Sequence, residues 1–189
     1  MLAYVFWHWK QRDVTGPEYE RRQRAFHAAL NASPSAGLRG SFSVGLSHAP
    51  WAAGGEDAYE DWYLVEDFGA LGRLNEAAVS GGRAAPHDAA AAVAAGGAGG
   101  VYRLRLGSVV PAPRYAHWFG KPDGVRYADL LAELSPLVDQ ARGGLWMRQM
   151  VLGPAREFCL HAPAPVGLPA ALGALVLSVR PVWAGPTGG

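Results

Sequence analysis

The first residues of the chain, Leu2 to Lys10, are rich in aromatic and β-branched side chains, which predicts a strand. Alternation along this run places Tyr4, Phe6 and His8 on one face and three large apolar residues on the other. Because both faces carry large side chains, we expect both to be covered by other parts of the protein.

A helix is predicted to follow, because Thr15 and Glu18 have the spacing of a capping box and Pro17 is tolerated in a first helical turn. Helical spacing gathers one packing face, which comprises Tyr19, Gln23, Phe26 and Leu30. Asn31 is among the polar residues expected off that face. One side of this helix should therefore pack and the other should meet water.

Alternating patterns predict two more strands, Leu38 to His48 and Tyr59 to Val65, joined by a loop over residues 51–58. Asp67 is placed to cap a second helix, whose apolar residues recur at helical spacing. The first of these strands has an apolar face formed by Phe42, Val44 and Leu46, and a small polar face that includes Ser41 and Ser43.

Residues 80–100 form a Gly/Ala-rich insertion. The alanine-rich run that Pro86, His87 and Asp88 introduce predicts a short helix, and the glycines after Ala95 are expected to end it. A fourth strand is predicted over Val101 to Val109. Its two faces are expected to comprise Tyr102, Leu104 and Leu106 on the apolar side, with Arg103 and Arg105 on the other.

The same order of elements then begins again. Tyr115 to Lys121 matches Tyr4 to Lys10 at the Tyr, Trp and Lys positions. The elements expected after it are a helix from Tyr127 to Val138, a hairpin over residues 145–160 that turns at Gly153-Pro154, a short helix over residues 166–174, a strand over residues 175–183 and a frayed tail. We therefore expect two units, residues 1–110 with the insertion at 80–100, and residues 111–189.

Two successive βαββαβ patterns resemble the dimeric α+β barrel superfamily, over about residues 1–183. The resemblance implies an α+β fold in which two tandem ferredoxin-like units form a pseudo-twofold α+β barrel with antiparallel sheets. It also implies that helices cover one face of each sheet, while the other faces enclose a shared cavity. Members of the superfamily include cofactor-free monooxygenases, isomerases, decarboxylases and haem enzymes similar to chlorite dismutase. A fold supports many activities, so we transfer no catalytic residue.

On this view the cavity binds a small molecule, and the polar sheet faces line it. The candidate ligand-binding residues are Ser41, Ser43, Arg103, Arg105, Arg148 and Arg180. Converging guanidinium groups would favour an anionic or carboxylate-bearing ligand. The alternative is a solvated or ion-paired sheet face, neutralised by Glu66 and Glu157.

His8 and His117 are the candidate catalytic bases, for proton transfer to or oxygenation of an aromatic or carbonyl substrate without a bound organic cofactor. Alternatively, both are hydrogen-bonded core residues, or one is the axial ligand of a haem. No HExxH or HxxxH spacing occurs in the sequence, so we expect no metal.

Two other groups of residues have competing interpretations. Cys159, His161 and Glu157 share one face of a predicted strand, which suits a nucleophile with its base, but a buried structural cysteine explains the pattern too. His87 and Asp88 could form a lid over a pocket, whereas Asp88 could simply cap a helix.

Composition excludes some classes of protein. The net charge is +1 and the arginines are scattered, so no nucleic-acid surface is expected. The apolar stretch over residues 166–179 is too short to cross a bilayer, and the start of the chain lacks the basic region of a signal peptide. A single cysteine favours the cytoplasm. The alternative to a ligand-binding protein or enzyme is a non-catalytic protein that self-associates, for example as a homodimer.

Overall fold

The computed structural model describes residues 1–51, 58–150 and 153–185, and the side chain of Met150 is not included. Parts of the expected loop (52–57), hairpin (151–152) and tail (186–189) lie outside the described residues. The strands are β1 (Leu2–Lys10), β2 (Leu38–Leu46), β3 (Ala58–Val65), β4 (Ala94–Gly107), β5 (Tyr115–Phe119), β6 (Gly144–Met150), β7 (Phe158–Ala162) and β8 (Leu175–Ala184). The helices are α1 (Gly16–Ala32), α2 (Phe68–Ala78), α3 (Ala84–Ala91) and α4 (Tyr127–Gln140), with short 3₁₀ turns at Gly81–Arg83 and Ala170–Leu172.

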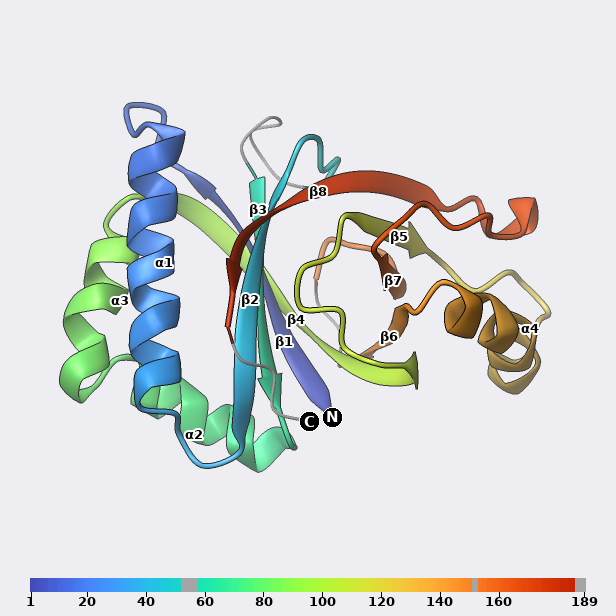
Figure 1. Ribbon diagram of the computed structural model, residues 1–189, viewed down its shortest axis with the longest axis horizontal. Helices are drawn as coiled ribbons and strands as arrows, with labels where there is room; N and C mark the ends of the chain where they lie inside the picture. The colour runs from blue at the N-terminus through green and yellow to red at the C-terminus, as the bar shows by residue number, and fades with distance from the viewer. Residues whose placement is uncertain (52–57, 151–152, 186–189) are drawn as a thin grey trace.

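The strands form one closed barrel in which every neighbouring pair is antiparallel (Figure 1). The strand order is β4–β1–β3–β2 in the first half of the chain and β8–β5–β7–β6 in the second. Because β1 and β5 occupy the same place in these two orders, the similar segments Tyr4 to Lys10 and Tyr115 to Lys121 begin equivalent strands. The expected α+β barrel with antiparallel sheets is confirmed, while the division of the chain at residue 110 stays a prediction.

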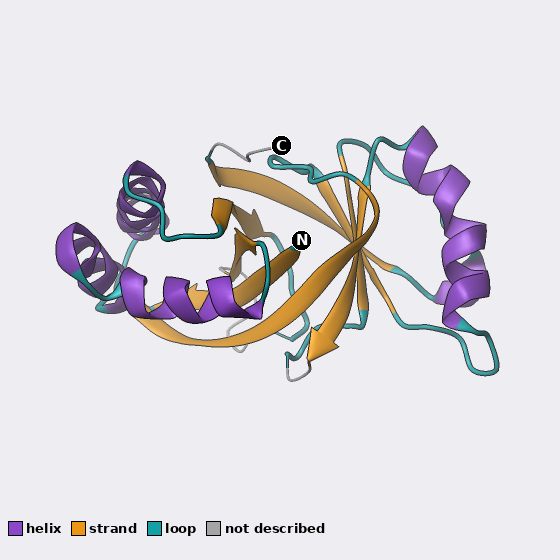
Figure 2. Ribbon diagram, turned by 90° about the horizontal axis from the view of Figure 1, so that it is seen from below, coloured by secondary structure: helices purple, strands orange, loops and turns teal. Residues whose placement is uncertain are grey.

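The helices cover two opposite sides of the barrel. Figures 1 and 2 show α1, α2 and α3 grouped on one side and α4 alone on the other. Thr15 and Asp67 cap α1 and α2 as predicted, with their side chains accepting hydrogen bonds from Glu18 N at 3.4 Å and Ala70 N at 2.7 Å. The capping box is incomplete, because the Glu18 carboxylate pairs with arginines on its own helix.

The barrel interior is filled by side chains, and this corrects the expectation of an enclosed cavity there. Its largest residues are four fully buried tryptophans, Trp7, Trp62, Trp118 and Trp146. Phe42, Val44, Leu46 and Tyr102 also point inward, although we expected their faces to meet the helices. An eight-stranded barrel is just wide enough for side chains to fill, so the faces with the largest apolar residues turn inward. The helices then cover the more polar outer faces.

The glycines after Ala95 also differ from the prediction, because they belong to β4 and do not end a segment. Gly97 and Gly99 pair with His8 and Phe6 of β1. A Cβ atom on Gly97 would lie 2.3 Å from Phe6 Cζ, and one on Gly99 would lie 2.5 Å from the Tyr4 hydroxyl. Glycine is therefore needed where the aromatic rings of β1 lie against the neighbouring strand.

The helix expected over residues 166–174 is only a 3₁₀ turn, Ala170–Leu172. Pro169 precedes this turn, and Gly173 follows it in the left-handed conformation, with φ 51°. A longer helix is therefore interrupted at both ends. In the part of the chain that the structure describes, no helix has the length and apolar character required to cross a membrane.

Candidate functional site

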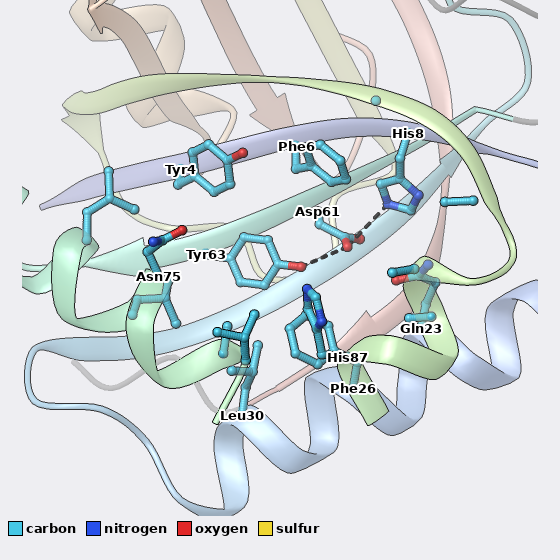
Figure 3. Close-up of a pocket in the computed structure, with 18 of the residues that line it drawn as sticks. Tyr4, Phe6, His8, Gln23, Phe26, Leu30, Asp61, Tyr63, Asn75 and His87 are labelled. Atoms are coloured by element: carbon cyan, nitrogen blue, oxygen red, sulfur yellow. Dashed lines mark hydrogen bonds and ion pairs between the residues drawn. The ribbon is translucent and has the colours of Figure 1, made fainter. Parts of the chain in front are cut away.

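A cavity of about 800 Å³ lies outside the barrel, between its outer face and the helices α1, α2 and α3 (Figure 3). Its volume is in the range of known small-molecule sites. Most of its walls are aromatic or aliphatic, and include Tyr4, Phe6, Phe26, Leu30, Leu71 and Leu74. The glycines and alanines at the start of β4 supply a wall with almost no side chains, which leaves room beside the aromatic rings of β1.

The polar part of this cavity is centred on Asp61 of β3, which is 1% exposed. The Tyr63 hydroxyl donates a hydrogen bond of 3.0 Å to Asp61 Oδ2. His8 Nε2 lies 3.2 Å from Asp61 Oδ2, and His27 Nε2 lies 3.2 Å from Asp61 Oδ1. These two imidazole contacts are close, but neither has the alignment of a good hydrogen bond. One buried carboxylate thus faces two imidazoles and a phenol.

Strand alternation and sheet register bring these groups together. Asp61 and Tyr63 point outward from β3. The alternating residues Glu60 and Trp62 point into the barrel. Asp61 lies opposite Phe6 on the adjacent strand β1, two residues from His8. The third element is α1, which packs over these strands and supplies His27 (Figure 1).

The electrostatics of the site follow from burial and from this cluster. Burial alone would raise the pKa of the Asp61 carboxyl, but His8 and His27 hold that pKa well below its usual value. Burial and the Asp61 charge raise the pKa of Tyr63 far above its usual value. Tyr63 therefore remains a neutral hydrogen-bond donor and Asp61 an anion.

Both histidines are also held from the other side of their rings. His8 Nδ1 lies 2.5 Å from the Tyr19 hydroxyl, and Tyr19 is hydrogen-bonded to the side chain of Gln23. His27 Nδ1 lies 2.8 Å from Ser41 Oγ, which accepts a hydrogen bond of 2.9 Å from Asn31 Nδ2. Each imidazole is therefore held by a hydroxyl at Nδ1 and lies close to Asp61 at Nε2.

The insertion covers this cavity. His87 of α3 is one of the lining residues, and Figure 3 shows its ring pointing into the cavity from the side opposite the sheet. Its side chain is 34% exposed, packs edge-on against Phe26 at 5.4 Å, and places Nδ1 3.0 Å from Asp88 Oδ1. Arg22 donates a hydrogen bond of 3.1 Å to the Ala89 carbonyl, which fastens α3 to α1. The location of His87 suits the expected lid, and the opening of this cover stays a prediction.

None of the four predicted arginines lines the cavity. Three of them, Arg103, Arg105 and Arg180, are exposed, so their expected placement in the interior is wrong. Arg148 is half-buried on the inward face of β6, opposite Tyr102. Arg103 hydrogen-bonds Gln149 at 3.0 Å. Arg148 donates to the Ala155 carbonyl at 3.2 Å. Arg180 forms an ion pair with the buried Glu20 of α1, although its own side chain is largely exposed. Because the interior is occupied by large apolar groups, a guanidinium group needs either water, as at the three exposed arginines, or a carbonyl partner, as at Arg148.

The two predicted serines are buried but lie outside the cavity lining. Ser41 holds His27, as described above, whereas the Ser43 hydroxyl has no hydrogen-bond partner among the described residues. Glu66 and Glu157, the expected partners of the arginines, behave differently from each other. Glu66 pairs with Arg39, and Glu157 accepts a hydrogen bond of 2.6 Å from the Tyr127 hydroxyl.

His117 lies away from the cavity, although His8 lies in it. Its Nδ1 is 3.3 Å from the Leu160 carbonyl, and its Nε2 accepts a hydrogen bond of 3.0 Å from Val166 N. Burial lowers the pKa of this imidazole. His117 is therefore a hydrogen-bonded core residue, with no free nitrogen for a substrate.

Cys159 and His161 lie in the filled barrel interior, and Glu157 is turned away toward α4. Burial, and then the nearby Glu60, raise the pKa of the Cys159 thiol well above its usual value. A thiol of this kind is a poor nucleophile. The three residues therefore do not assemble into a nucleophilic site, and the structural interpretation of Cys159 fits.

The sequence reasoning missed Asp61, Tyr63 and His27. A signal for them was present, because Tyr19, Gln23, His27 and Asn31 recur at every fourth position of one helix. Such spacing places polar side chains in one row. Asp61 itself stands within a run of large apolar and aromatic residues, where an ionised side chain is costly unless it has partners.

Comparison with known proteins gives no match to a family model, and no match to a curated protein. Solved structures do match over nearly the whole chain. A proposed monooxygenase from Fusobacterium nucleatum has a TM-score of 0.67 at 8% identity, covering 100% of this chain and 95% of its own. The chain has the α+β barrel fold.

Two further structures share the barrel. An anthrone oxidase-like protein has a TM-score of 0.55 at 9% identity, covering 95% of this chain and 90% of its own. A proposed monooxygenase from Lactobacillus acidophilus has a TM-score of 0.52 at 13% identity, covering 99% of this chain and 97% of its own. At such low identity the likeness concerns the fold alone, so the site must be argued from this chain's own residues.

The histidines proposed from sequence are poorly placed to act as ligands of a metal or a haem. Within residues 1–51, 58–150 and 153–185, no three His, Cys, Asp or Glu side chains gather in a way that could hold a metal ion. His8 and His117 each have both ring nitrogens in contact with other groups. Neither therefore has a lone pair available as the axial ligand of a haem.

Proposed function

We propose that this α+β barrel binds an aromatic small molecule in the cavity beneath α1, α2 and α3, and that Asp61 accepts an acidic hydrogen of that molecule. The observation that carries the proposal is a buried, ionised carboxylate at the polar part of a largely apolar cavity of about 800 Å³. Aromatic walls suit a planar ligand, and a few convergent polar groups orient it.

The depressed pKa of Asp61 limits the chemistry. A weak base removes a hydrogen only when that hydrogen is already acidic, as in a phenol or in a CH₂ group between aryl and carbonyl-conjugated rings. Asp61 is almost completely buried, which strengthens the interaction between the carboxylate and such a hydrogen. The ligand class proposed is therefore a hydroxylated or carbonyl-bearing polycyclic aromatic molecule.

If the site is catalytic, cofactor-independent oxygenation is the reaction that we propose. An activated CH₂ group would lose a proton toward Asp61, and dioxygen would accept the electrons. The balanced change is R₂CH₂ + O₂ → R₂C=O + H₂O, in which one oxygen atom enters the product and the other leaves as water. The names of the similar structures, two monooxygenases and an anthrone oxidase-like protein, support this choice of reaction.

Binding is tested with alizarin, a dihydroxyanthraquinone whose absorbance reports the ionisation of its phenols. We expect the protein to bind alizarin and to change its spectrum. Asp61→Asn should weaken binding by roughly 10- to 100-fold, because a hydrogen bond to a charged group contributes about 1.5–3 kcal/mol. Asp129→Asn is the matched control, since Asp129 pairs with Arg126 at the start of α4, on the other side of the barrel. Equal binding by the two variants would contradict the proposal.

Catalysis is tested separately, by oxygen uptake with anthrone as the substrate. Wild-type protein should consume one O₂ for each anthraquinone formed, and Asp61→Asn should not. Uptake that is absent while alizarin still binds would reduce the proposal to a binding function. Uptake that Asp61→Asn retains in full would remove Asp61 from the reaction.

The self-association alternative has less support. The large hydrophobic residues that are exposed among those described are Met1, Phe68, Val79, Tyr127 and Val176. They belong to separate elements: the N-terminus, the two ends of α2, the start of α4 and the strand β8. Single exposed hydrophobic residues are normal on protein surfaces, so they do not favour an interaction surface over the cavity.

A further inference from the structure

We infer that α1 fixes the tautomers of both imidazoles beside Asp61, so that His8 and His27 each direct an Nε2–H group at the carboxylate and Asp61 alone is free to accept a hydrogen from a ligand. His27 does not line the cavity, so it is a positioning residue. The assignment of the tautomers stands independently, whereas its effect on a ligand rests on the proposed function.

The row of polar residues on α1 is the basis of this inference. Tyr19, Gln23, His27 and Asn31 follow one another at intervals of four, and so lie along one side of the helix. The order of groups across the site is amide, hydroxyl, imidazole, carboxylate, imidazole, hydroxyl, amide. The residues that supply them in that order are Gln23, Tyr19, His8, Asp61, His27, Ser41 and Asn31.

The protons on the His27 side can be placed one by one. Asn31 contacts the backbone carbonyl of His27 at 2.7 Å, and a carbonyl only accepts, so the amide NH₂ group must face it. The same NH₂ group donates to Ser41 Oγ at 2.9 Å. Among the described residues, the acceptor left for the Ser41 hydroxyl hydrogen is His27 Nδ1, at 2.8 Å. Nδ1 therefore carries no proton, and the ring proton is on Nε2, facing Asp61.

The Nδ1–H tautomer of His27 does not suit this network. Its Nδ1–H group and Asn31 would both donate to Ser41 Oγ, and the hydroxyl hydrogen would then have no acceptor among the described residues. Ser41 is fully buried, so an unpaired hydroxyl hydrogen would carry the full cost of its lost hydration. Of the two neutral tautomers, the Nε2–H form is the one that satisfies every partner.

The His8 side has the same arrangement. Tyr19 is fully buried, and burial together with the Asp61 charge raises its pKa and so keeps the proton on its phenol. Gln23 donates to the Tyr19 oxygen, since this hydrogen bond lowers the pKa of the phenol, and the hydroxyl hydrogen is therefore left for His8. The Tyr19 hydroxyl then donates to His8 Nδ1 at 2.5 Å. The His8 proton is thereby placed on Nε2, 3.2 Å from Asp61 Oδ2.

The consequence is a division of roles within the cluster. Three hydrogen-bearing groups face Asp61, namely His8 Nε2, His27 Nε2 and the Tyr63 hydroxyl. Neither imidazole retains a lone pair for a ligand, so His8 orients the site although it lines the cavity. The sequence-based choice of His8 as the base is replaced by Asp61, whose charge the fixed donors maintain.

Nuclear magnetic resonance of ¹⁵N-labelled histidine side chains tests the tautomers directly, with His8→Gln and His27→Gln used to assign the signals. At a pH high enough for the imidazoles to be neutral, we expect the proton of each ring on Nε2 and the lone pair on Nδ1. Detection of an Nδ1–H tautomer at either ring in the wild-type protein would overturn the inference, whatever the ligand does.

Ser41→Ala removes the hydroxyl that fixes His27, and we expect the Nδ1–H tautomer of His27 to appear while His8 is unchanged. Ser43→Ala is the matched control, because Ser43 is a buried serine of the same strand whose hydroxyl has no hydrogen-bond partner among the described residues. Ser41→Thr keeps a hydroxyl and should restore the wild-type tautomer. If Ser41→Ala does not fold, Asn31→Ala interrupts the same chain of hydrogen bonds. Identical His27 signals in Ser41→Ala and Ser43→Ala would contradict the assignment.

The link to the proposed function is tested with alizarin. Ser41→Ala should weaken alizarin binding several-fold, and Ser43→Ala should leave it unchanged, although neither serine lines the cavity. If the tautomers are as assigned but alizarin does not bind the wild-type protein, the proposed function fails and the tautomer assignment stands. If alizarin binds and Ser41→Ala has no effect on it, the positioning role of His27 is refuted.

Discussion

Glu60→Gln should remove a large pH dependence from the stability of the barrel. Glu60 points into the filled interior, is fully buried, and accepts hydrogen bonds from the indole nitrogens of Trp7 at 3.1 Å and Trp62 at 3.2 Å. Burial raises its pKa from 4.5 to about 7, although both indole hydrogen bonds oppose the rise. The folded protein therefore keeps the Glu60 proton at pH values where the unfolded chain has lost it.

The sign and size of the effect follow from this difference. The stability that the neutral carboxyl contributes is complete below pH 4.5 and is lost as the pH rises through about 7. The whole loss is about 3 kcal/mol, because each tenfold change in proton affinity corresponds to about 1.4 kcal/mol. Gln does not ionise, but its NH₂ group cannot accept the Trp62 hydrogen bond, which costs about 1 kcal/mol at every pH. Relative to wild type, the variant should gain about 2–3 kcal/mol between pH 5 and pH 8.

Urea unfolding at several pH values between 5 and 8, followed by tryptophan fluorescence, measures this difference. Glu76→Gln is the control, since Glu76 is exposed on α2 and should show no comparable trend. A stability difference between Glu60→Gln and wild type that is constant over this pH range would refute the reasoning.

Four other substitutions test packing, helix propensity, a helix cap and a buried histidine. Gly97→Ala should destabilise the protein by about 1–3 kcal/mol, because the new Cβ atom would lie 2.3 Å from Phe6 Cζ and 2.8 Å from the Trp7 carbonyl oxygen. Gly72 lies inside α2 with open space around it, so Gly72→Ala should instead stabilise the protein by about 0.5–1 kcal/mol in the same urea titration. Asp67→Ala should cost about 1 kcal/mol by removing the cap of α2, and an unchanged urea midpoint would show that the cap contributes nothing. Burial lowers the pKa of His161 from 6.5 to about 3. The neutral ring therefore contributes stability that is complete above pH 6.5 and is lost as the pH falls toward 3. His161→Gln should make the stability of the protein less dependent on pH in this acid range.

Much of the fold could be predicted from local patterns. The bounds of β1 and the caps at Thr15 and Asp67 depend on residues within four positions of one another, and all are as expected. The hairpin of β6 and β7 also forms, with Leu145 paired to Leu160. The glycine-rich start of β4 was missed, because the reason for its glycines is the set of aromatic rings on β1.

The site was harder to predict, because its members come from separate elements. Alternation correctly placed His8 on one face of a strand, but it could not show which face would meet the helices. That choice depends on barrel closure, which buries the faces with the largest side chains and leaves Asp61 outside. For the same reason the arginines expected in a cavity, such as Arg103 and Arg180, lie on the outer surface.

The sequence by itself determined the alternation of strands and helices, the caps and the similarity of the two halves, since these depend on the repeat lengths of strand and helix and on contacts between near neighbours. Only the tertiary structure decided that the barrel is solid, that the cavity lies beneath α1, α2 and α3, and that Asp61 meets His8 and His27. The physical reason is that the orientation of a face is a property of the closed sheet. A strand read alone has two faces, and packing selects which of them is buried.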